Sequence, residues 1–169
     1  NILMITEFLT KKDFSWVDVQ EPETEDFERL NTDFALPYLL VQDCLRPEHL
    51  PKYEESEEGG HFLMMRSFDY DSHQNDTSVQ ELTRKIALFI SNNRLVTIHR
   101  VELPYLTQVA EKTKKTDYPK SLHALIHQVI LAVIRTYDVP VLRLQDLYDG
   151  FEHEILAKKN EHLSTIRIY

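Results

Sequence analysis

The chain has 169 residues and a formal net charge of −9, from 19 Lys and Arg against 28 Asp and Glu. This length suits one domain with a helical extension. An acidic surface repels nucleic-acid phosphates and anionic lipid headgroups, so the charge argues against a nucleic-acid partner and is compatible with cations. The single cysteine, Cys44, excludes a disulfide within the chain, which suits a reducing cytoplasm.

No uninterrupted apolar run approaches the roughly 20 residues that a membrane-spanning helix needs. No signal peptide is visible at the start. The sequence begins with Asn1 and ends, over residues 163–169, inside an amphipathic pattern without a helix stop signal. We therefore expect a soluble fragment of a longer protein.

The first third of the chain predicts strands followed by short helices. Residues 2–8 and 14–19 are expected to be strands, and the second run alternates between two faces. A helix is expected to begin at Pro22, because proline suits the first helical position, and a second is expected over residues 37–44 for the same reason. The segment 46–53 contains two prolines and is predicted to be irregular or extended.

The middle of the chain adds strands that lie close together in sequence. Residues 54–60 are interpreted as an acidic turn, and residues 61–70, 83–90 and 94–99 as strands, the last two joined by an asparagine-rich turn. A helix is predicted over residues 103–115. Strands mixed with helices in this order predict an α/β/α sandwich around a mixed β-sheet.

From Leu122 to Ile155 apolar residues recur at three- and four-residue spacing, which predicts one long amphipathic helix or two in series. Pro140 is expected to kink or divide it, and a partner helix is expected to begin at about Asn160. The chain thus divides into an α/β domain, residues 1–117, and a segment at 118–169 that holds the long helix and the start of its partner.

Two histidines suggest a metal site. His123 and His127 are four residues apart and share one helix face, so together they would chelate a metal ion. No third ligand can be assigned, and a solvated helix face is the simpler interpretation of the pair. The chain has no glycine-rich phosphate loop, no Gly-x-Ser-x-Gly elbow and no Cys-x-x-Cys pair. We therefore do not expect an enzyme; a metal-dependent hydrolase that uses these histidines is the enzymatic alternative.

Three further residues are singled out by their positions. His99 ends a strand, where a structural hydrogen bond is expected, and Cys44 is expected to be buried. Asp43 lies near the end of a short helix, where its carboxylate suits a hard cation. One carboxylate does not make a Mg²⁺ site, since Mg²⁺ requires several oxygens and keeps water. The acidic residues of the 54–60 turn are interpreted as a solvated loop.

Several segments, in order, resemble the cytoplasmic domain of the CorA family of magnesium and cobalt transporters. Trp16-Val17-Asp18 is similar to the family's Trp-x-Asp strand, and Phe34 to Asp43 is similar to its Phe-Gly-x-His-Pro-Leu-x-x-Glu-Asp helix. Leu50 to Glu54 is similar to the Arg-Pro-Lys-x-Glu that follows, and Leu95 to His99, with Leu88 to Ile90, is similar to a hairpin ending in Val-Thr-Val-His. Leu122 to Ile155 is similar to the first long helix after the sheet.

The resemblance implies a homopentameric membrane protein. Such transporters combine an α/β/α cytoplasmic domain, a helical pair, a stalk helix and two membrane helices with a Gly-Met-Asn signature. The chain would then lie on the cytoplasmic side of the bacterial plasma membrane, attached through C-terminal helices outside the 169 residues. We expect this fragment not to conduct ions itself. The transported ion implied is Mg²⁺ or Co²⁺.

In this family, Mg²⁺ bound between cytoplasmic domains holds the pore closed, and Asp43 matches the aspartate of that regulatory site. Gln42 replaces the usual glutamate, and Leu131 takes the place of a further carboxylate on the long helix. We therefore expect Mg²⁺ to bind this fragment weakly or not at all. Two other hypotheses remain open: a Zn²⁺-transporting relative of the same superfamily, and a stand-alone soluble metal-binding module.

Overall fold

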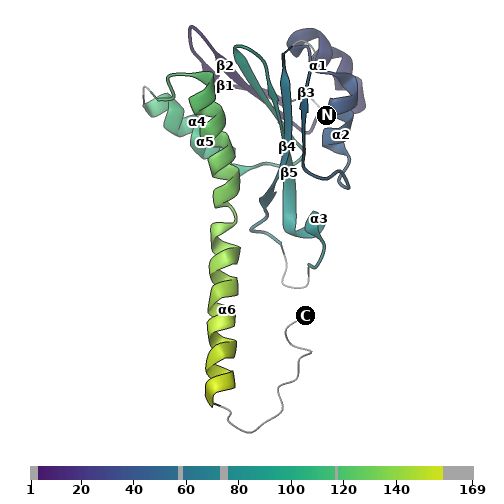
Figure 1. Ribbon diagram of the computed structural model, residues 1–169. Coiled ribbons are helices and arrows are strands. Elements are labelled where there is room, and N and C mark those ends of the chain that lie inside the picture. The colour runs from purple at the N-terminus through teal and green to yellow at the C-terminus, as the bar shows by residue number, and fades with distance from the viewer. Residues whose placement is uncertain (1–3, 57–58, 73–75, 117, 158–169) are drawn as a thin grey trace. The chain divides into compact units, whose positions relative to one another are not determined.

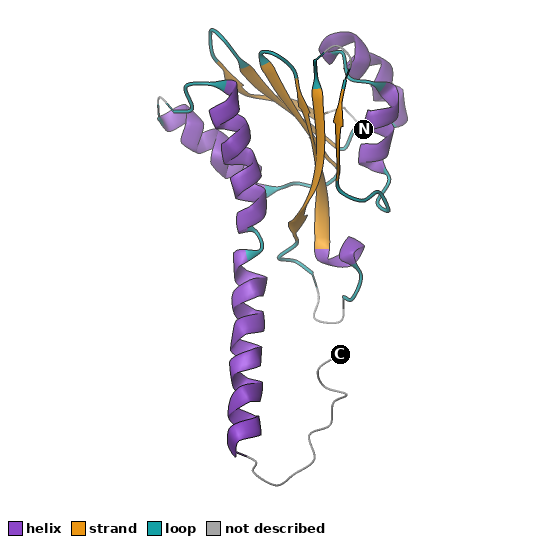
Figure 2. Ribbon diagram, viewed as in Figure 1, coloured by secondary structure: helices purple, strands orange, loops and turns teal. Residues whose placement is uncertain are grey.

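The computed structural model describes residues 4–56, 59–72, 76–116 and 118–157. A six-stranded sheet lies between two helical layers (Figures 1 and 2), with strand order β1-β2-β6-β5-β4-β3. The strands are β1 (Met4–Thr10), β2 (Ser15–Gln20), β3 (Lys52–Glu55), β4 (His61–Phe68), β5 (Thr83–Ile90) and β6 (Arg94–His99). Neighbours β2 and β6 run parallel, and every other pair in this sheet is antiparallel. The predicted α/β/α sandwich around a mixed sheet is confirmed.

The helices form the two outer layers of this sandwich and continue after it. They are η1 (Thr24–Asp26), α1 (Phe27–Phe34), α2 (Tyr38–Leu45), α3 (Val79–Leu82), α4 (Pro104–Lys115), α5 (Leu122–Arg135) and α6 (Asp138–Ala157). Helices α1 and α2 cover one face of the sheet, and α4 and α5 cover the other (Figure 1).

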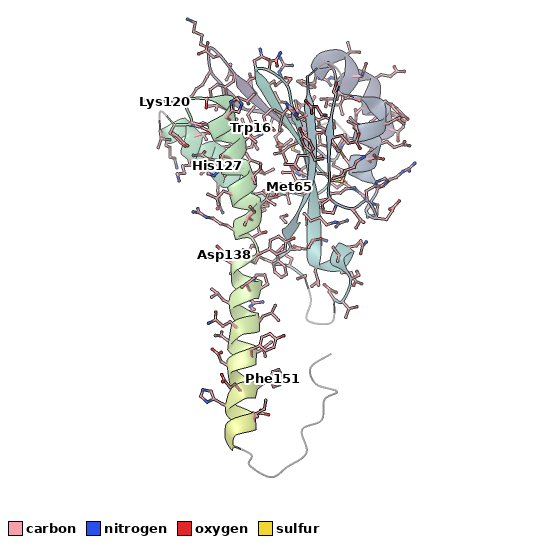
Figure 3. All side chains as sticks on the ribbon, in the orientation of Figure 1. Trp16, Met65, Lys120, His127, Asp138 and Phe151 are labelled. Atoms are coloured by element: carbon pink, nitrogen blue, oxygen red, sulfur yellow. The ribbon has the colours of Figure 1, made fainter. Side chains whose placement is uncertain are left out.

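Each central strand supplies side chains to two separate cores, because successive residues point to opposite faces. In β2, Trp16 packs under α4 and α5, whereas Val17 and Val19 pack under α1 and α2. Figure 3 shows Trp16 on its strand beside the α4–α5 layer. The division in β5 is the same: Ile86 belongs to the first core and Ala87 to the second. Burial on both faces explains why these strands are almost continuously apolar.

Strand β3 is where the sequence prediction was wrong. Residues 46–53 were predicted to be irregular or extended and residues 54–60 to form an acidic turn, but Lys52–Glu55 is a strand that pairs antiparallel with β4, from Lys52 opposite Met64 to Glu55 opposite His61. The strand lies at the edge of the sheet, and its residues are mostly exposed. An exposed edge strand carries no apolar alternation, so its sequence gives no periodic signal.

The helical region breaks between α5 and α6, four residues before Pro140. A proline ring inside a helix clashes with the carbonyl four residues earlier, which here belongs to Thr136. The Oγ1 of Thr136 donates to the carbonyl of Val133 at 2.6 Å and accepts a hydrogen bond from the Phe68 amide at 2.8 Å. The break is therefore fixed both by Pro140 and by a bond to β4, and the two helices follow in series.

The chain divides into two compact units, Asn1–Thr136 and Tyr137–Tyr169. The first includes α5, which the division by sequence assigns to the helical segment, because Leu125 and Val129 of α5 are fully buried in the sheet core. The second contains α6, whose side chains over residues 141–150 are all exposed. Figure 3 shows side chains extending from this helix, on which Phe151 is labelled. The expected partner helix at Asn160 lies outside the described residues.

By length and composition, Leu122–Ile155 is one candidate membrane span, where the sequence analysis expected none. The two results differ because the sequence analysis looked for an uninterrupted apolar run. The mean hydropathy of the helical region stays high even though polar residues interrupt each apolar run. The core helix of a soluble domain meets the same criterion, and α5 packs in this way against the sheet. Leu122, Leu125, Val129 and Val133 of α5 are buried in this way, whereas Val141, Leu142, Leu144 and Leu147 of α6 are exposed.

Candidate divalent-cation site

Asp43 lies in the last turn of α2, on the flank of the helix rather than on its buried face. Val41 and Cys44 of the same helix face the sheet and are buried. The Asp43 side chain is 20% exposed. The carboxylate therefore stands at the margin between the core and solvent, where both a protein cation and a dissolved ion can reach it.

Both Asp43 carboxylate oxygens already have nitrogen partners. Lys52 Nζ lies 2.7 Å from Asp43 Oδ2, and His49 Nε2 lies 3.5 Å from Oδ1. Lys52 also contacts Glu54 Oε1 at 2.6 Å, so one ammonium group bridges two carboxylates. This bridge exists because β3 carries Lys52 and Glu54 on one side of the edge strand. The sequence analysis had treated Glu54 as part of a solvated turn.

The charges of this cluster shift the pKa of its members in opposite directions. Partial burial raises the pKa of the Asp43 carboxyl. The hydrogen bond and charge of Lys52, together with the charges of His49 and Arg46, lower it by more, so the pKa lies below its usual value. Burial lowers the pKa of Lys52, yet its bonds to Asp43 and Glu54 raise it above normal overall. Lys52 is therefore an ammonium ion, and Asp43 a carboxylate, throughout the physiological range.

A divalent cation at this position would have to displace Lys52 from between Asp43 and Glu54. Two carboxylates suit Mg²⁺, which binds through one or two carboxylates and keeps water. Within the described residues, no group of three or more His, Cys, Asp or Glu side chains is arranged to hold a metal. The geometry thus offers two oxygen-bearing side chains around a position filled by a protein ammonium group.

Basic residues of the sheet fix the backbone on which Asp43 stands. Lys85 Nζ donates to the carbonyls of Asp43, at 2.6 Å, and Arg46. Arg66 donates to the carbonyls of Pro47 and His49, and Arg100 to that of Leu45. The last carbonyls of a helix lack intrahelical partners and carry the negative end of its dipole, so cations are favourable there.

A second polar cluster is buried on the face that carries Trp16. His99 Nε2 lies 3.0 Å from Asp18 Oδ2, and Thr97 Oγ1 donates to Asp18 Oδ1. Trp16 Nε1 donates to Thr97 Oγ1 at 3.1 Å. These residues meet because β2 and β6 pair in parallel, with Asp18 opposite Thr97. The structural hydrogen bond expected for His99 is thus present, and its second ring nitrogen, Nδ1, faces the Val101 carbonyl at 2.6 Å.

Of the other residues singled out from the sequence, Gln42 and Cys44 flank Asp43 on α2, but Leu131, His123 and His127 lie on α5, across the sheet. Gln42 lies on α2 and Leu131 on α5, which cover opposite faces of the sheet. His123 and His127 are exposed on α5; Figure 3 shows His127 on that helix. Cys44 is buried, as expected, and burial raises the pKa of its thiol to about 12, which makes it a poor nucleophile.

Comparisons with solved structures find the same fold. CorA magnesium transporter from Methanocaldococcus jannaschii matches with 18% identity and a TM-score of 0.64, over 88% of this chain and 46% of that one. The soluble domain of the same protein matches with 19% identity and a TM-score of 0.64, over 86% and 56%. The ZntB cytoplasmic domain from Vibrio parahaemolyticus matches with 15% identity and a TM-score of 0.67, over 88% and 64%.

The chain therefore spans about half the length of the complete M. jannaschii transporter. A search of the curated proteins finds no match. The family model described as CorA-like Mg²⁺ transporter protein matches residues 11–168, which is nearly all of the sequence. On that match the chain belongs to the family of CorA-like Mg²⁺ transporter proteins.

Proposed function

We propose that this chain is the cytoplasmic regulatory and assembly domain of a divalent-cation transporter that moves Mg²⁺ or Co²⁺. The observation that carries the proposal is the family match over residues 11–168. The fold shared with the soluble domain of M. jannaschii CorA supports it. The transporter would be a homopentamer in the bacterial plasma membrane, with this domain on the cytoplasmic side.

Within that function, we assign Asp43 to the contact through which cytoplasmic cations act. It stands at the protein surface beside Glu54, and both carboxylates are bridged by Lys52. Because α2 and α5 cover opposite faces of the sheet, a further acidic partner for Asp43 would come from another copy of the chain rather than from α5. Cation binding between copies would then hold neighbouring domains together, and its loss would shift the equilibrium of the pore.

Zn²⁺ is the second candidate for the transported ion. The observation in its favour is the match to the ZntB cytoplasmic domain, which covers 88% of this chain, as large a share as the match to CorA. The remaining alternative, a stand-alone soluble metal-binding module, has no membrane part and would transport nothing.

The experiment is an ion-flux assay on the full-length protein that contains this chain, reconstituted in liposomes with an ion-sensitive dye inside. We expect Mg²⁺ or Co²⁺ flux that falls as Mg²⁺ rises on the side facing this domain, and we expect Asp43→Asn to shift the inhibitory Mg²⁺ concentration upward. Asp33→Asn, at an exposed position of α1, is the matched control. Flux of Zn²⁺ alone would favour the second candidate, and absence of flux for all three ions would overturn the proposal.

A further inference from the structure

A cavity of about 440 Å³ lies between the sheet and the layer of α1 and α2 (Figure 1). Its floor is one row of side chains that crosses four strands. Glu54 of β3 lies opposite Phe62 of β4, and Phe62 lies opposite Phe89 of β5. Phe89 in turn lies opposite Val96 of β6. The turn that joins α1 to α2 and the first residues of α2 form the other wall, so the first unit alone bounds the cavity.

The size of the cavity and its fixed outer wall indicate a preformed binding site rather than a packing defect. Protein interiors contain few voids larger than a water molecule. A volume of 440 Å³ falls within the roughly 300–1,000 Å³ of small-molecule sites. In the outer wall, the Ala35 amide donates to the Asn31 carbonyl at 2.8 Å, and Asn31 Nδ2 donates to the Leu36 carbonyl at 2.9 Å. These hydrogen bonds hold the turn in place without a ligand.

The interior of the cavity is apolar and largely aromatic. The rings of Phe62 and Phe89 have centroids 4.8 Å apart and planes tilted by 52°, and Phe34 lies at one side. Leu39 stands at the rim and is 69% exposed. Removing apolar surface from water is favourable, so a ligand with an apolar body would be bound here. A flat ring system suits this floor, because aromatic rings prefer tilted or offset contacts with one another.

The acidic end of the row already has its cation. Lys52 Nζ contacts Glu54 Oε1 at 2.6 Å, so Glu54 does not require a cationic ligand. Glu55 and His61 also border the cavity, but they pair with each other one position further along the strands. Because successive residues of a strand point to opposite faces, their side chains point away from the face that carries Glu54 and Phe62. The ligand therefore needs no positive group at this end.

Arg94 marks the other end, on β6, about 14 Å away when neighbouring strands lie 4.7–4.9 Å apart. Its guanidinium group lies over the Phe34 ring, 5.5 Å from the centroid. Arg94 donates to the Ser15 hydroxyl and to the Asp33 carbonyl, each at 3.4 Å. Both bonds are long and both acceptors are uncharged. A guanidinium group has five N–H donors, so Arg94 keeps donors for a carboxylate, which arginine binds through two parallel hydrogen bonds.

We propose that this cavity binds an aromatic carboxylate, with its ring system on Phe62 and Phe89 and its carboxylate at Arg94. One apolar body with one acidic end matches an apolar floor with one arginine at its end. The span between the two ends of the row accommodates two fused rings and a short acidic arm. This ligand is not the cation of the proposed transport function, so the site does not depend on which ion the protein moves.

The test is a titration of the chain with naphthylacetate, followed by NMR of backbone amides and by calorimetry. The amide signals of Phe89 and Val96 should shift, whereas the indole signal of Trp16, the single tryptophan, should not, because Trp16 lies in the core on the opposite face. Naphthylethanol has the same rings with a hydroxyl in place of the carboxylate, and it should bind about tenfold more weakly. Equal affinity for the acid and the alcohol would overturn the proposal.

Arg94→Gln separates the carboxylate contact from the apolar floor. It should weaken binding of naphthylacetate by about tenfold, the effect of losing a hydrogen bond to a charged group, and leave binding of naphthylethanol unchanged. Arg29→Gln removes the same charge from a position on α1 that is 62% exposed, and it should keep the affinity for the acid within about twofold. Equal weakening of acid and alcohol in Arg94→Gln would contradict the assigned contact.

A second pair of variants tests the cavity without touching Arg94 or the core. Leu39→Glu places a carboxylate at the rim and should weaken binding of naphthylacetate, whereas Leu50→Glu, at a position that is 70% exposed and outside the cavity, should not. Failure of the unmodified chain to bind naphthylacetate would overturn the proposal. Self-association of the chain that Leu39→Glu abolishes, without binding of the acid, would overturn it in favour of a contact between copies.

Discussion

Asp18 and Asp43 are both held by nitrogen and oxygen donors, but they differ in how readily their partners can change. The Asp18 side chain is 7% exposed, and its partners Thr97 and His99 stand on the strand hydrogen-bonded to its own. The Asp43 side chain is 20% exposed, and its main partner is the long Lys52 side chain of an edge strand. The comparison teaches that the buried cluster joins two paired strands through partners on neighbouring backbone, whereas the surface cluster depends on one long side chain at the edge of the sheet.

The largest expected effect comes from the buried cluster. Asp18→Ala should lower the free energy of unfolding by about 3–5 kcal/mol, because it leaves His99 and Thr97 buried without their acceptor. Urea denaturation followed by circular dichroism measures this loss. Asp43→Ala is the matched comparison, and an equal loss in the two variants would break the distinction between the clusters.

A neutral buried bond provides an intermediate scale. Thr136→Val keeps the side-chain volume but removes the acceptor of the Phe68 amide, so we expect a loss of about 1–3 kcal/mol in the free energy of unfolding. Thr116→Val, at an exposed position after α4, is the control and should change little. If Thr136→Val also changes little, the bond between the end of α5 and β4 does not hold the two elements together.

The surface cluster should contribute little to stability. Asp43→Asn should cost about 1 kcal/mol or less at pH 7, the range of ion pairs near solvent. Because the pKa of Asp43 is lowered on folding, its contribution is present above the unfolded-state pKa and is lost as the pH falls through the folded-state value. The difference between the unmodified chain and Asp43→Asn should therefore shrink in denaturation at acid pH. A difference that grows there would contradict the stated direction.

The sequence was informative where structure depends on local pattern and uninformative where it depends on distant pairing. The alternation of residues 14–19 predicted a strand that contributes to both faces, and β2 does so. The position of His99 at the end of a strand predicted a structural hydrogen bond. Its partner Asp18 was not predicted, because the two residues are 81 positions apart in the sequence and meet only through the parallel pairing of β2 and β6. Asp43 was singled out by its helix position, yet the bridging Lys52 was not, because β3 lacks a periodic signal.

The most direct test of the role of Asp43 is a calorimetric titration of the chain with Mg²⁺ at pH 7. Because Lys52 already bridges Asp43 and Glu54 and no third carboxylate is at hand among the described residues, we predict a Kd weaker than about 1 mM. In Lys52→Met the two carboxylates lose their ammonium partner, and Mg²⁺ should bind more tightly than in the unmodified chain. Sub-millimolar binding to the unmodified chain that is no tighter in Lys52→Met would contradict the account, in which Lys52 occupies the position between the two carboxylates.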